Sequence, residues 1–283
     1  ALEKDSIVNC DETWCKVRKY DHYKKCYIWV LVNKAERVVI FFYDNGSRGR
    51  DVLTDFIGDA ELKSIMSDGY NAYTFIGNEL KAAETPNLSK TDHQVCLAHA
   101  RAKFVKASEQ AGDKNADIFI KYIEDLYNLE RQYTKDNLTD EERGKQRQGL
   151  ETKGILINLR THLGIEKSKD PATVTPYLQK ALNYLDTFWA NIFTYIKDGS
   201  YPIDNNAAER AVRPLTTQRN NMLHFGSDEG AKMAATYHSI ISTVKLQGRS
   251  AWDYLGKFFV NIFNGCRDFF SLRPGNIGLA TCQ

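Results

Sequence analysis

The sequence predicts a mixed α/β protein whose sheet core is interrupted by a large block of helices, and three observations lead to this prediction. Two runs of β-branched and aromatic residues, 26–32 and 38–43, follow one another near the N-terminus, as in paired strands. Apolar residues recur at helical spacing through 113–200. After residue 200, capping and turn residues delimit three further helices. We therefore expect parts of the core on both sides of the helical block.

The overall composition is that of a globular protein. Of the 283 residues, 42% are hydrophobic and 26% are charged, which excludes an intrinsically disordered chain. The formal net charge is +2, so a site for nucleic acid would have to concentrate its cations on one face. The longest apolar runs are far shorter than the roughly 20 residues of a membrane helix. The six cysteines form no C-x-x-C pair, which favours a reducing compartment, and we expect a bacterial cytoplasmic protein.

The N-terminal residues predict three successive antiparallel strands. The first covers 6–17, where Val8, Trp14 and Val17 flank a polar centre. The runs 26–32 and 38–43 are joined by a short polar segment and pair most simply as a hairpin.

The next elements alternate between helices and strands. Apolar residues at helical spacing after Asn45-Gly46 predict a helix that ends at Gly58. A strand over 63–68, a short helix carrying Tyr73 and Ile76, a strand over 92–98 and a basic helix from His99 follow. This order matches a sheet of the ribonuclease H type, although the periodicity also permits other α/β arrangements.

The remaining chain is predicted to be helical. A capping box at Thr139–Glu142 begins one helix, and Thr175-Pro176 begins a long helix with apolar positions as far as Ile196. Helices over 204–213, 228–246 and 250–264 complete the chain. The predicted organisation is a first part of the core at 1–112, a helical insertion at 113–200, and a completion of the core with C-terminal helices at 201–283.

Two carboxylates lie where strands place functional groups. Asp11 falls in the middle of the first strand, and the alternation of a strand sends the neighbouring Glu12 to the opposite face. Asp68 ends the fourth strand, at the edge where open α/β sheets bind ligands. In a ribonuclease H-type sheet these strands are neighbours, so the two acids would converge. The plainer interpretations are a solvated edge-strand acid and an ordinary Asp-Gly turn.

A third candidate, Glu209, lies in a predicted helix with Asp204 as N-cap and Pro214 as terminator. At 100° per residue its face also carries four further residues, Asn205, Asn206, Val212 and Arg213. A carboxylate beside two amides and an arginine is typical of a site. A solvated face with an ordinary Glu209–Arg213 pair is the alternative.

Cations are clustered near these acids. One cluster contains Arg101, Lys103 and Lys106 without an acid between them, and a second group follows Glu209 in the sequence, namely Arg210, Arg213, Arg219, Lys232, Lys245 and Arg249. Cations gathered around acids suit a polyanion that must approach a metal site, whereas an ordinary mixed surface is the alternative. The sequence has no phosphate-binding G-x-x-x-x-G-K-[ST] loop and no G-x-S-x-G elbow, which argues against P-loop NTPases and serine hydrolases.

Four ordered motifs resemble the catalytic region of the IS-sixty-six (IS66) family of bacterial insertion-sequence transposases. They are Asp11-Glu12-Thr13, Ser67-Asp68-Gly69-Tyr70-x-x-Tyr73, Cys96-Leu97-Ala98-His99-Ala100-Arg101-x-Lys103-Phe104, and Asp204-Asn205-Asn206-x-x-Glu209-Arg210-x-x-Arg213-Pro214. The later Arg219-Asn220-Asn221, Phe225-Gly226-Ser227 and Gly230-Ala231 are also similar to that family. Leu97 is a departure, since the family often has an aromatic residue there.

The resemblance implies a DDE transposase with a ribonuclease H-like core. Asp11, Asp68 and Glu209 match the family's metal-binding acids, which would hold Mg²⁺ or Mn²⁺, two ions per active site. DNA, as element ends and target, would contact eight residues: Arg101, Lys103, Asn205, Asn206, Arg210, Arg213, Arg219 and Lys245. Because the chain begins at Ala1, we expect it to be a fragment of a longer protein, without the N-terminal DNA-binding part that the family resemblance implies.

The expected activity is metal-dependent DNA strand cleavage and strand transfer that moves an insertion sequence. We also expect a homo-oligomer when the protein is assembled on DNA, a nucleoid-associated location, and accessory proteins of the same element as further partners. Two alternatives remain open. One is a metal-dependent nuclease of the same fold without strand transfer, and the other is a non-catalytic transposase-derived DNA-binding protein.

Overall fold

The computed structural model describes residues 2–78 and 85–278. The chain divides into two compact units. The first comprises Ala1–Ile65, Asn78–Thr91 and Asn206–Gln283, and the second comprises Met66–Gly77 and Asp92–Asn205. All helices between residues 113 and 200 belong to the second unit.

The fold is mixed α/β with a five-stranded sheet. The strands are β1 (Ser6–Arg18), β2 (Tyr23–Asn33), β3 (Val38–Phe42), β4 (Leu62–Ser67) and β5 (Asp92–Val95), in the order β3-β2-β1-β4-β5. The pairs β1–β2 and β2–β3 are antiparallel, which confirms the three successive antiparallel strands.

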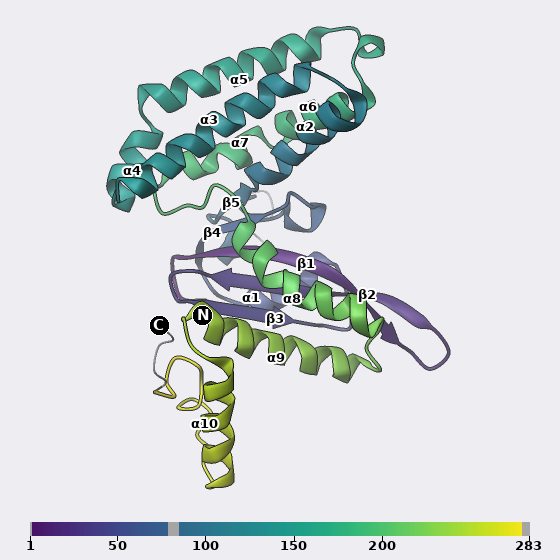
Figure 1. Ribbon diagram of the computed structural model, residues 1–283, viewed down its shortest axis with the longest axis vertical. Helices are drawn as coiled ribbons and strands as arrows, with labels where there is room; N and C mark the ends of the chain where they lie inside the picture. Colours follow the sequence, from purple (N-terminus) through teal and green to yellow (C-terminus); the bar gives the residue numbers. More distant parts are fainter. Residues whose placement is uncertain (1, 79–84, 279–283) are drawn as a thin grey trace. The chain divides into compact units, whose positions relative to one another are not determined.

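In the first unit, one face of β1–β3 is covered by α8 (Asn206–Met222) and α9 (Asp228–Leu246) (Figure 1). Small and branched side chains allow this close packing. Ala208, Val212 and Leu215 of α8 are buried with Val17, Ile28 and Val30 of the sheet, and Ala231 and Ala235 of α9 join the same core. Burial of this apolar surface is the main free-energy term that holds both helices on the sheet.

The opposite face of the same strands packs against α1 (Arg50–Ile57). The rings of Phe42 and Phe56 are stacked with their centroids 3.8 Å apart, and Trp29 lies beside Phe42 at 6.2 Å. Gly58 ends α1 at a positive φ of 56°, as the sequence predicted.

Helix α9 also lies along β3, where two of its hydroxyl groups bond to the strand backbone. The Thr243 hydroxyl accepts from Val39 N at 3.0 Å and donates to Val39 O at 2.9 Å. The Ser239 hydroxyl accepts from Phe41 N at 2.7 Å and lies 3.1 Å from Phe41 O. Beyond α9, α10 (Ala251–Phe263) begins at the Ser250 N-cap, as predicted.

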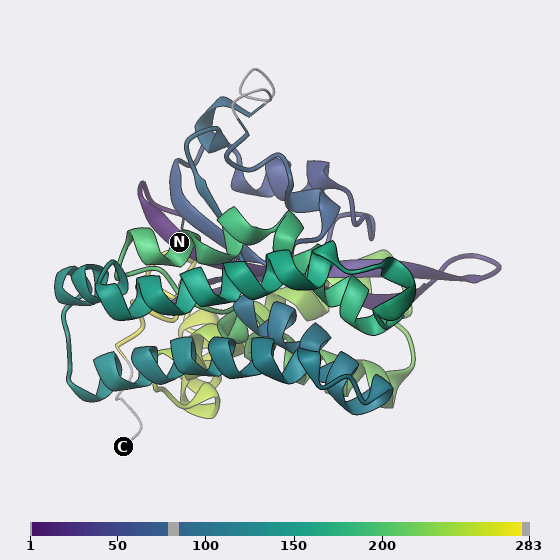
Figure 2. The same ribbon diagram turned by 90° about the horizontal axis from the view of Figure 1, so that it is seen from above.

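The second unit is built on helices. They are α2 (Leu97–Ala111), α3 (Asn115–Lys135), α4 (Asp140–Arg147), α5 (Leu150–Ser168), α6 (Pro176–Thr187) and α7 (Trp189–Ile192). Figure 2 shows α3 and α5 as long neighbouring helices. Phe104 of α2 and Phe119 of α3 stack at 4.5 Å in the core, and the predicted capping box of Thr139 and Glu142 begins α4.

A buried arginine ties this unit together. The Arg147 side chain is 2% exposed and donates to both carboxylate oxygens of Glu130, at 2.7 and 2.8 Å. Its Nη1 also donates to the carbonyls of Tyr195, Asp198 and Tyr201. These bonds satisfy carbonyls of the segment that follows α7. The buried guanidinium therefore holds in place a segment that is not α-helical.

Three helix predictions are wrong in detail. The helix that begins at Thr175-Pro176 does not run to Ile196, because α6 ends at Thr187 and the 3₁₀ helix η5 (Phe193–Lys197) follows α7. The short helix at Tyr73 is a 3₁₀ turn, Asn71–Tyr73, that does not reach Ile76. Pro214 does not end α8, which continues to Met222, because buried Val212 and Leu215 on either side hold the helix against the sheet.

The cysteines in the described part of the chain, Cys10, Cys15, Cys26, Cys96 and Cys266, are free thiols. Cys282 lies outside the described residues. Among the helices that the structure describes, none has the length and apolar character needed to cross a membrane.

Candidate active site

Asp11 lies in the middle of β1, on the face that α8 covers. Its antiparallel partner is Val30, and such partners lie on the same face of a sheet. Because Val30 is buried in the core beneath α8, Asp11 is directed toward the same side. The residue is partly buried, and its Oδ1 accepts a hydrogen bond from Glu12 N at 2.8 Å. An acid therefore lies on a central strand, on the face that α8 covers.

Glu12 points to the other face, as the alternation predicted. Its antiparallel partner is Trp29, which packs on the side of α1. The Glu12 side chain is 1% exposed, and its Oε1 accepts from Arg48 Nε at 2.9 Å and Nη2 at 2.6 Å. An arginine pair of this kind compensates the cost of burying a carboxylate. Arg48 was missed in the sequence because it lies in a loop with no periodic pattern.

Glu209 lies in the first turn of α8 rather than near the middle of a helix, since the helix begins at Asn206 and extends past Pro214. It is partly buried, directly after Ala208, which is fully buried in the core under α8. Asp11 and Glu209 thus belong to β1 and α8, two elements of the first unit that pack on each other.

Asp204, the predicted N-cap, lies two residues before the first residue of α8. Asp204 and Asn205 belong to the second unit, where the Asp204 carboxylate accepts from the Tyr127 hydroxyl at 3.3 Å. Burial, reinforced by the negative charge of Asp204, raises the pKa of Tyr127 well above its usual value, so the hydroxyl remains a donor. Asn205 is fully buried, and its backbone N donates to Cys96 Sγ at 3.1 Å.

Asp68 follows β4 directly and belongs to the second unit. Its Oδ1 accepts from Tyr70 N at 2.8 Å, and its carbonyl accepts from the Tyr184 hydroxyl at 2.6 Å. Gly69 has a φ of +82°, and a Cβ there would lie 3.2 Å from the Tyr184 hydroxyl, so both conformation and space favour glycine. Burial and the nearby Asp68 raise the pKa of Tyr184. The meeting of Asp68 with Asp11 and Glu209 stays a prediction.

The predicted DNA-contacting residues occupy several environments. Arg210 and Arg213 are exposed on α8, Asn206 is partly buried at its start, and Lys245 is exposed in the last turn of α9. Arg219 turns toward β1 and donates to Thr13 Oγ1 and Trp14 O, both at 2.9 Å.

In the second unit, Arg101 lies 3.8 Å from a Glu124 carboxylate oxygen. The Lys103 ammonium lies 4.6 Å from the ring centroid of Tyr184. Tyr184 therefore contacts both the Asp68 backbone and a predicted DNA-binding lysine. Sequence reasoning missed this tyrosine, because it reads as an ordinary apolar position of α6.

The geometry defines a class of α/β protein. Acidic side chains lie on a central strand and on the helix that covers it. The chain belongs to the transposase IS66 family, whose profile matches residues 1–233. This finding confirms the resemblance carried by the four motifs.

Curated relatives are similar over much of this chain. The uncharacterized protein y4jD of Sinorhizobium fredii (strain NBRC 101917 / NGR234) is 26% identical over 201 residues, covering 71% of this chain and 38% of the relative. The uncharacterized proteins y4qI and y4hP of the same organism are 28% and 26% identical, covering 84% and 83% of this chain. They are covered over 43% and 44% of their own lengths, so the chain spans about two fifths of the curated relatives it matches.

Proposed function

We propose that the chain supplies the catalytic region of a DDE transposase that cleaves DNA at the ends of an insertion sequence and joins those ends to target DNA. The observation that carries the proposal is the placement of Asp11 and Glu209. These acids are far apart in the sequence, yet they lie on β1 and α8, which pack together in one unit. Membership of the transposase family supports the same assignment.

The donor chemistry fits Mg²⁺ or Mn²⁺. Carboxylate oxygens are hard ligands, and a partly buried carboxylate is stabilised by a cation. Asp11 and Glu209, with Asp68 as the third proposed acid, would hold two such ions. When bound, divalent ions polarise a phosphodiester and stabilise the charge of its in-line displacement.

The chain's own residues bind and orient DNA in this proposal. Arg210 and Arg213 are exposed on the same helix as Glu209, where they attract phosphates toward the acids. Hydrolysis of one phosphodiester by water frees a 3′-hydroxyl at the element end. That hydroxyl then attacks a target phosphodiester, forming one bond as another breaks, with the proton passing to solvent. No covalent bond to the protein is required.

The test compares Glu209→Gln with Glu229→Gln, which removes a 3.3 Å ion pair with Lys232 on α9 but touches no proposed metal ligand. Both variants are incubated with Mn²⁺ and a plasmid carrying the DNA that flanks this gene. Glu209→Gln is expected to lower cleavage by about 100-fold or more, because loss of a ligand removes several kcal/mol of charge stabilisation. DNA retention should be largely unchanged.

The reaction products separate the alternatives. Nicked DNA together with joined products supports a transposase, whereas nicked DNA alone identifies a nuclease without strand transfer. Equal cleavage by Glu209→Gln and Glu229→Gln would remove Glu209 from the site. A protein that binds DNA without any cleavage, with Glu209 intact, would be a non-catalytic relative.

A further inference from the structure

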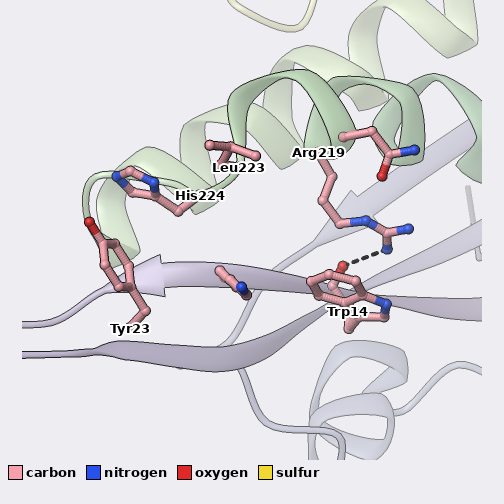
Figure 3. Close-up of a pocket in the computed structure, with 7 residues that line it drawn as sticks. Trp14, Tyr23, Arg219, Leu223 and His224 are labelled. Carbon is pink, nitrogen blue, oxygen red and sulfur yellow. Dashed lines mark hydrogen bonds between the residues drawn. The ribbon is translucent and has the colours of Figure 1, made fainter.

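A cavity of about 560 Å³ opens in the first unit where the second half of β1 meets the end of α8. Its volume lies within the range of roughly 300–1,000 Å³ typical of ligand sites. Figure 3 shows its walls, which are formed by Trp14, Lys16, Tyr23, Arg219, Leu223 and His224. Apart from Arg219, none of these residues belongs to the proposed catalytic or DNA-contacting set.

The cavity is bounded by flat side chains. Tyr23 and His224 stand together on one side with their ring centroids 4.7 Å apart. Trp14 and Arg219 stand together on the other side, with the guanidinium carbon 4.1 Å from the indole centroid. Lys16 of β1 also lines the cavity.

Large apolar and aromatic groups are exposed here, which is unusual for a strand and a helix end. Tyr23 is 56% exposed, Leu223 is 70% exposed and Trp14 is 38% exposed. Leu223 also has a positive φ of 64°, a conformation that non-glycine residues adopt infrequently. Exposed aromatic surface of this kind marks a binding site more often than a scattered single residue does.

The charge around the cavity is positive. Lys16 and Arg219 line it, and no carboxylate is among the described residues of the lining. Lys25 is the antiparallel partner of Lys16, and its ammonium lies 5.8 Å from the Trp14 ring centroid. Lys24 is exposed on the same hairpin. Flat aromatic surface together with cations is the combination that binds unpaired nucleotides, because bases stack on the rings while phosphates contact the cations.

We propose that this cavity binds an unpaired nucleotide of the DNA substrate, with its base between the Tyr23–His224 pair and the Trp14–Arg219 pair and its phosphate near Lys16. The identity of the ligand rests on the proposed role in DNA processing. An acidic peptide would use the cations alone and would leave the exposed rings without a role. A nucleotide accounts for both the exposed rings and the cations. The proposal adds to the proposed function that DNA is bound with at least one base outside the duplex.

The test measures binding of fluorescent DNA duplexes by anisotropy in EDTA, so that cleavage does not contribute. One duplex is blunt, a second carries a short single-stranded extension, and a third carries an abasic extension of the same length. The intact protein is expected to bind the second duplex about 5- to 100-fold more tightly than the other two, the range for stacking one base.

Tyr23→Ala should reduce this preference, whereas Lys16→Ala should weaken binding of both extended duplexes, because both carry the phosphate. Tyr23 is exposed, so its removal tests stacking without disturbing the core. Trp252→Ala is the matched control, because Trp252 is an 84% exposed aromatic on α10 that lies outside the cavity. Trp252→Ala should keep the full preference. Circular dichroism of each variant checks that the chain is folded.

Equal affinity for blunt and extended duplexes would overturn the inference, and so would equal affinity for abasic and normal extensions. It would also be overturned if polyglutamate displaced the extended duplex as effectively as an unlabelled oligonucleotide does. The cleavage assay with Mn²⁺ tests the proposed catalytic role separately from this inference. A protein that cleaves DNA but shows no preference for the extension contradicts only this inference. A protein that prefers the extension but never cleaves contradicts only the proposed catalytic role.

Discussion

Arg219 and Trp14 form a stacked pair that joins α8 to β1. The guanidinium carbon lies 4.1 Å from the indole centroid, and Nη1 donates to Trp14 O at 2.9 Å and to Thr13 Oγ1 at 2.9 Å. One side chain therefore satisfies a backbone carbonyl of the strand, bonds a neighbouring hydroxyl and covers an aromatic ring.

The first prediction concerns the stability of this pair. Arg219→Ala removes two hydrogen bonds and a cation–π contact, so the free energy of unfolding should fall by about 1–3 kcal/mol. Urea denaturation measures it. The control is Arg213→Ala, an exposed arginine on the same helix, which should change stability by less than about 0.5 kcal/mol. Equal stability of the two variants would show that the Arg219 contacts are not stabilising.

The second prediction concerns the buried carboxylate of Glu12. Arg48→Ala removes the guanidinium that donates two hydrogen bonds to this 1% exposed side chain, and loss of one member of a buried pair destabilises a protein strongly. Because Arg48 itself is 36% exposed, we expect a loss near the lower end of the usual range, about 2–4 kcal/mol. Arg18→Ala, at an exposed arginine of β1, is the control, and a similar loss there would contradict the prediction.

The third prediction concerns the stability of the fold at acidic pH. Burial lowers the pKa of His93 to about 4, and the ring bonds Ser67 Oγ at 2.9 Å. Between pH 6.5 and 4 the unfolded chain takes up a proton that the folded chain does not, so stability falls as the pH falls through this range. The loss attributable to His93 approaches roughly 3 kcal/mol at the lower limit.

Urea denaturation at a series of pH values measures this effect. His93→Gln should flatten the stability curve between pH 6.5 and 4, since glutamine takes up no proton. His22→Gln is the control, because His22 is an exposed residue of the β1–β2 turn, and its curve should follow that of the parent. A His93→Gln curve as steep as the parent's would assign the acid sensitivity to other groups.

The fourth prediction concerns the salt dependence of DNA binding. Arg213→Ala should weaken binding and reduce the slope of log K against log salt by about one unit, because one phosphate contact and its released counterion are lost. Arg131→Ala on α3, where the arginine is 2.5 Å from Glu124, is the matched control. An unchanged slope for Arg213→Ala would exclude its contact with phosphate.

The strands and helix ends were predictable because their signals are local. The hairpin between β2 and β3, the stop at Gly58 and the capping box at Thr139 each depend on a few adjacent residues. Pro214 was misjudged because its effect is not local. A proline inside a helix costs about 3 kcal/mol, but Val212 and Leu215 bury enough apolar surface to keep α8 continuous.

In the candidate site, the faces of the strand residues were predictable from the sequence, but the contact between α8 and β1 was not. Strand alternation correctly separated Asp11 from Glu12, since a period of two residues assigns faces without any tertiary information. The same period should have flagged Trp14, which was grouped with the apolar residues of its strand. It lies between buried Thr13 and Cys15 and so faces outward, beside Lys16 rather than in the core. The α8–β1 contact that sets Glu209 near the sheet depends on long-range packing, which no local pattern contains.

The hydroxyl bonds from α9 to β3 limit how this protein can associate with itself. An outermost strand normally offers its free N–H and C=O groups to any neighbouring chain. Here Ser239 and Thr243 already engage the backbone of Phe41 and Val39. Intermolecular strand addition at the β3 edge is therefore blocked, so copies that meet at this edge do so through side-chain surfaces.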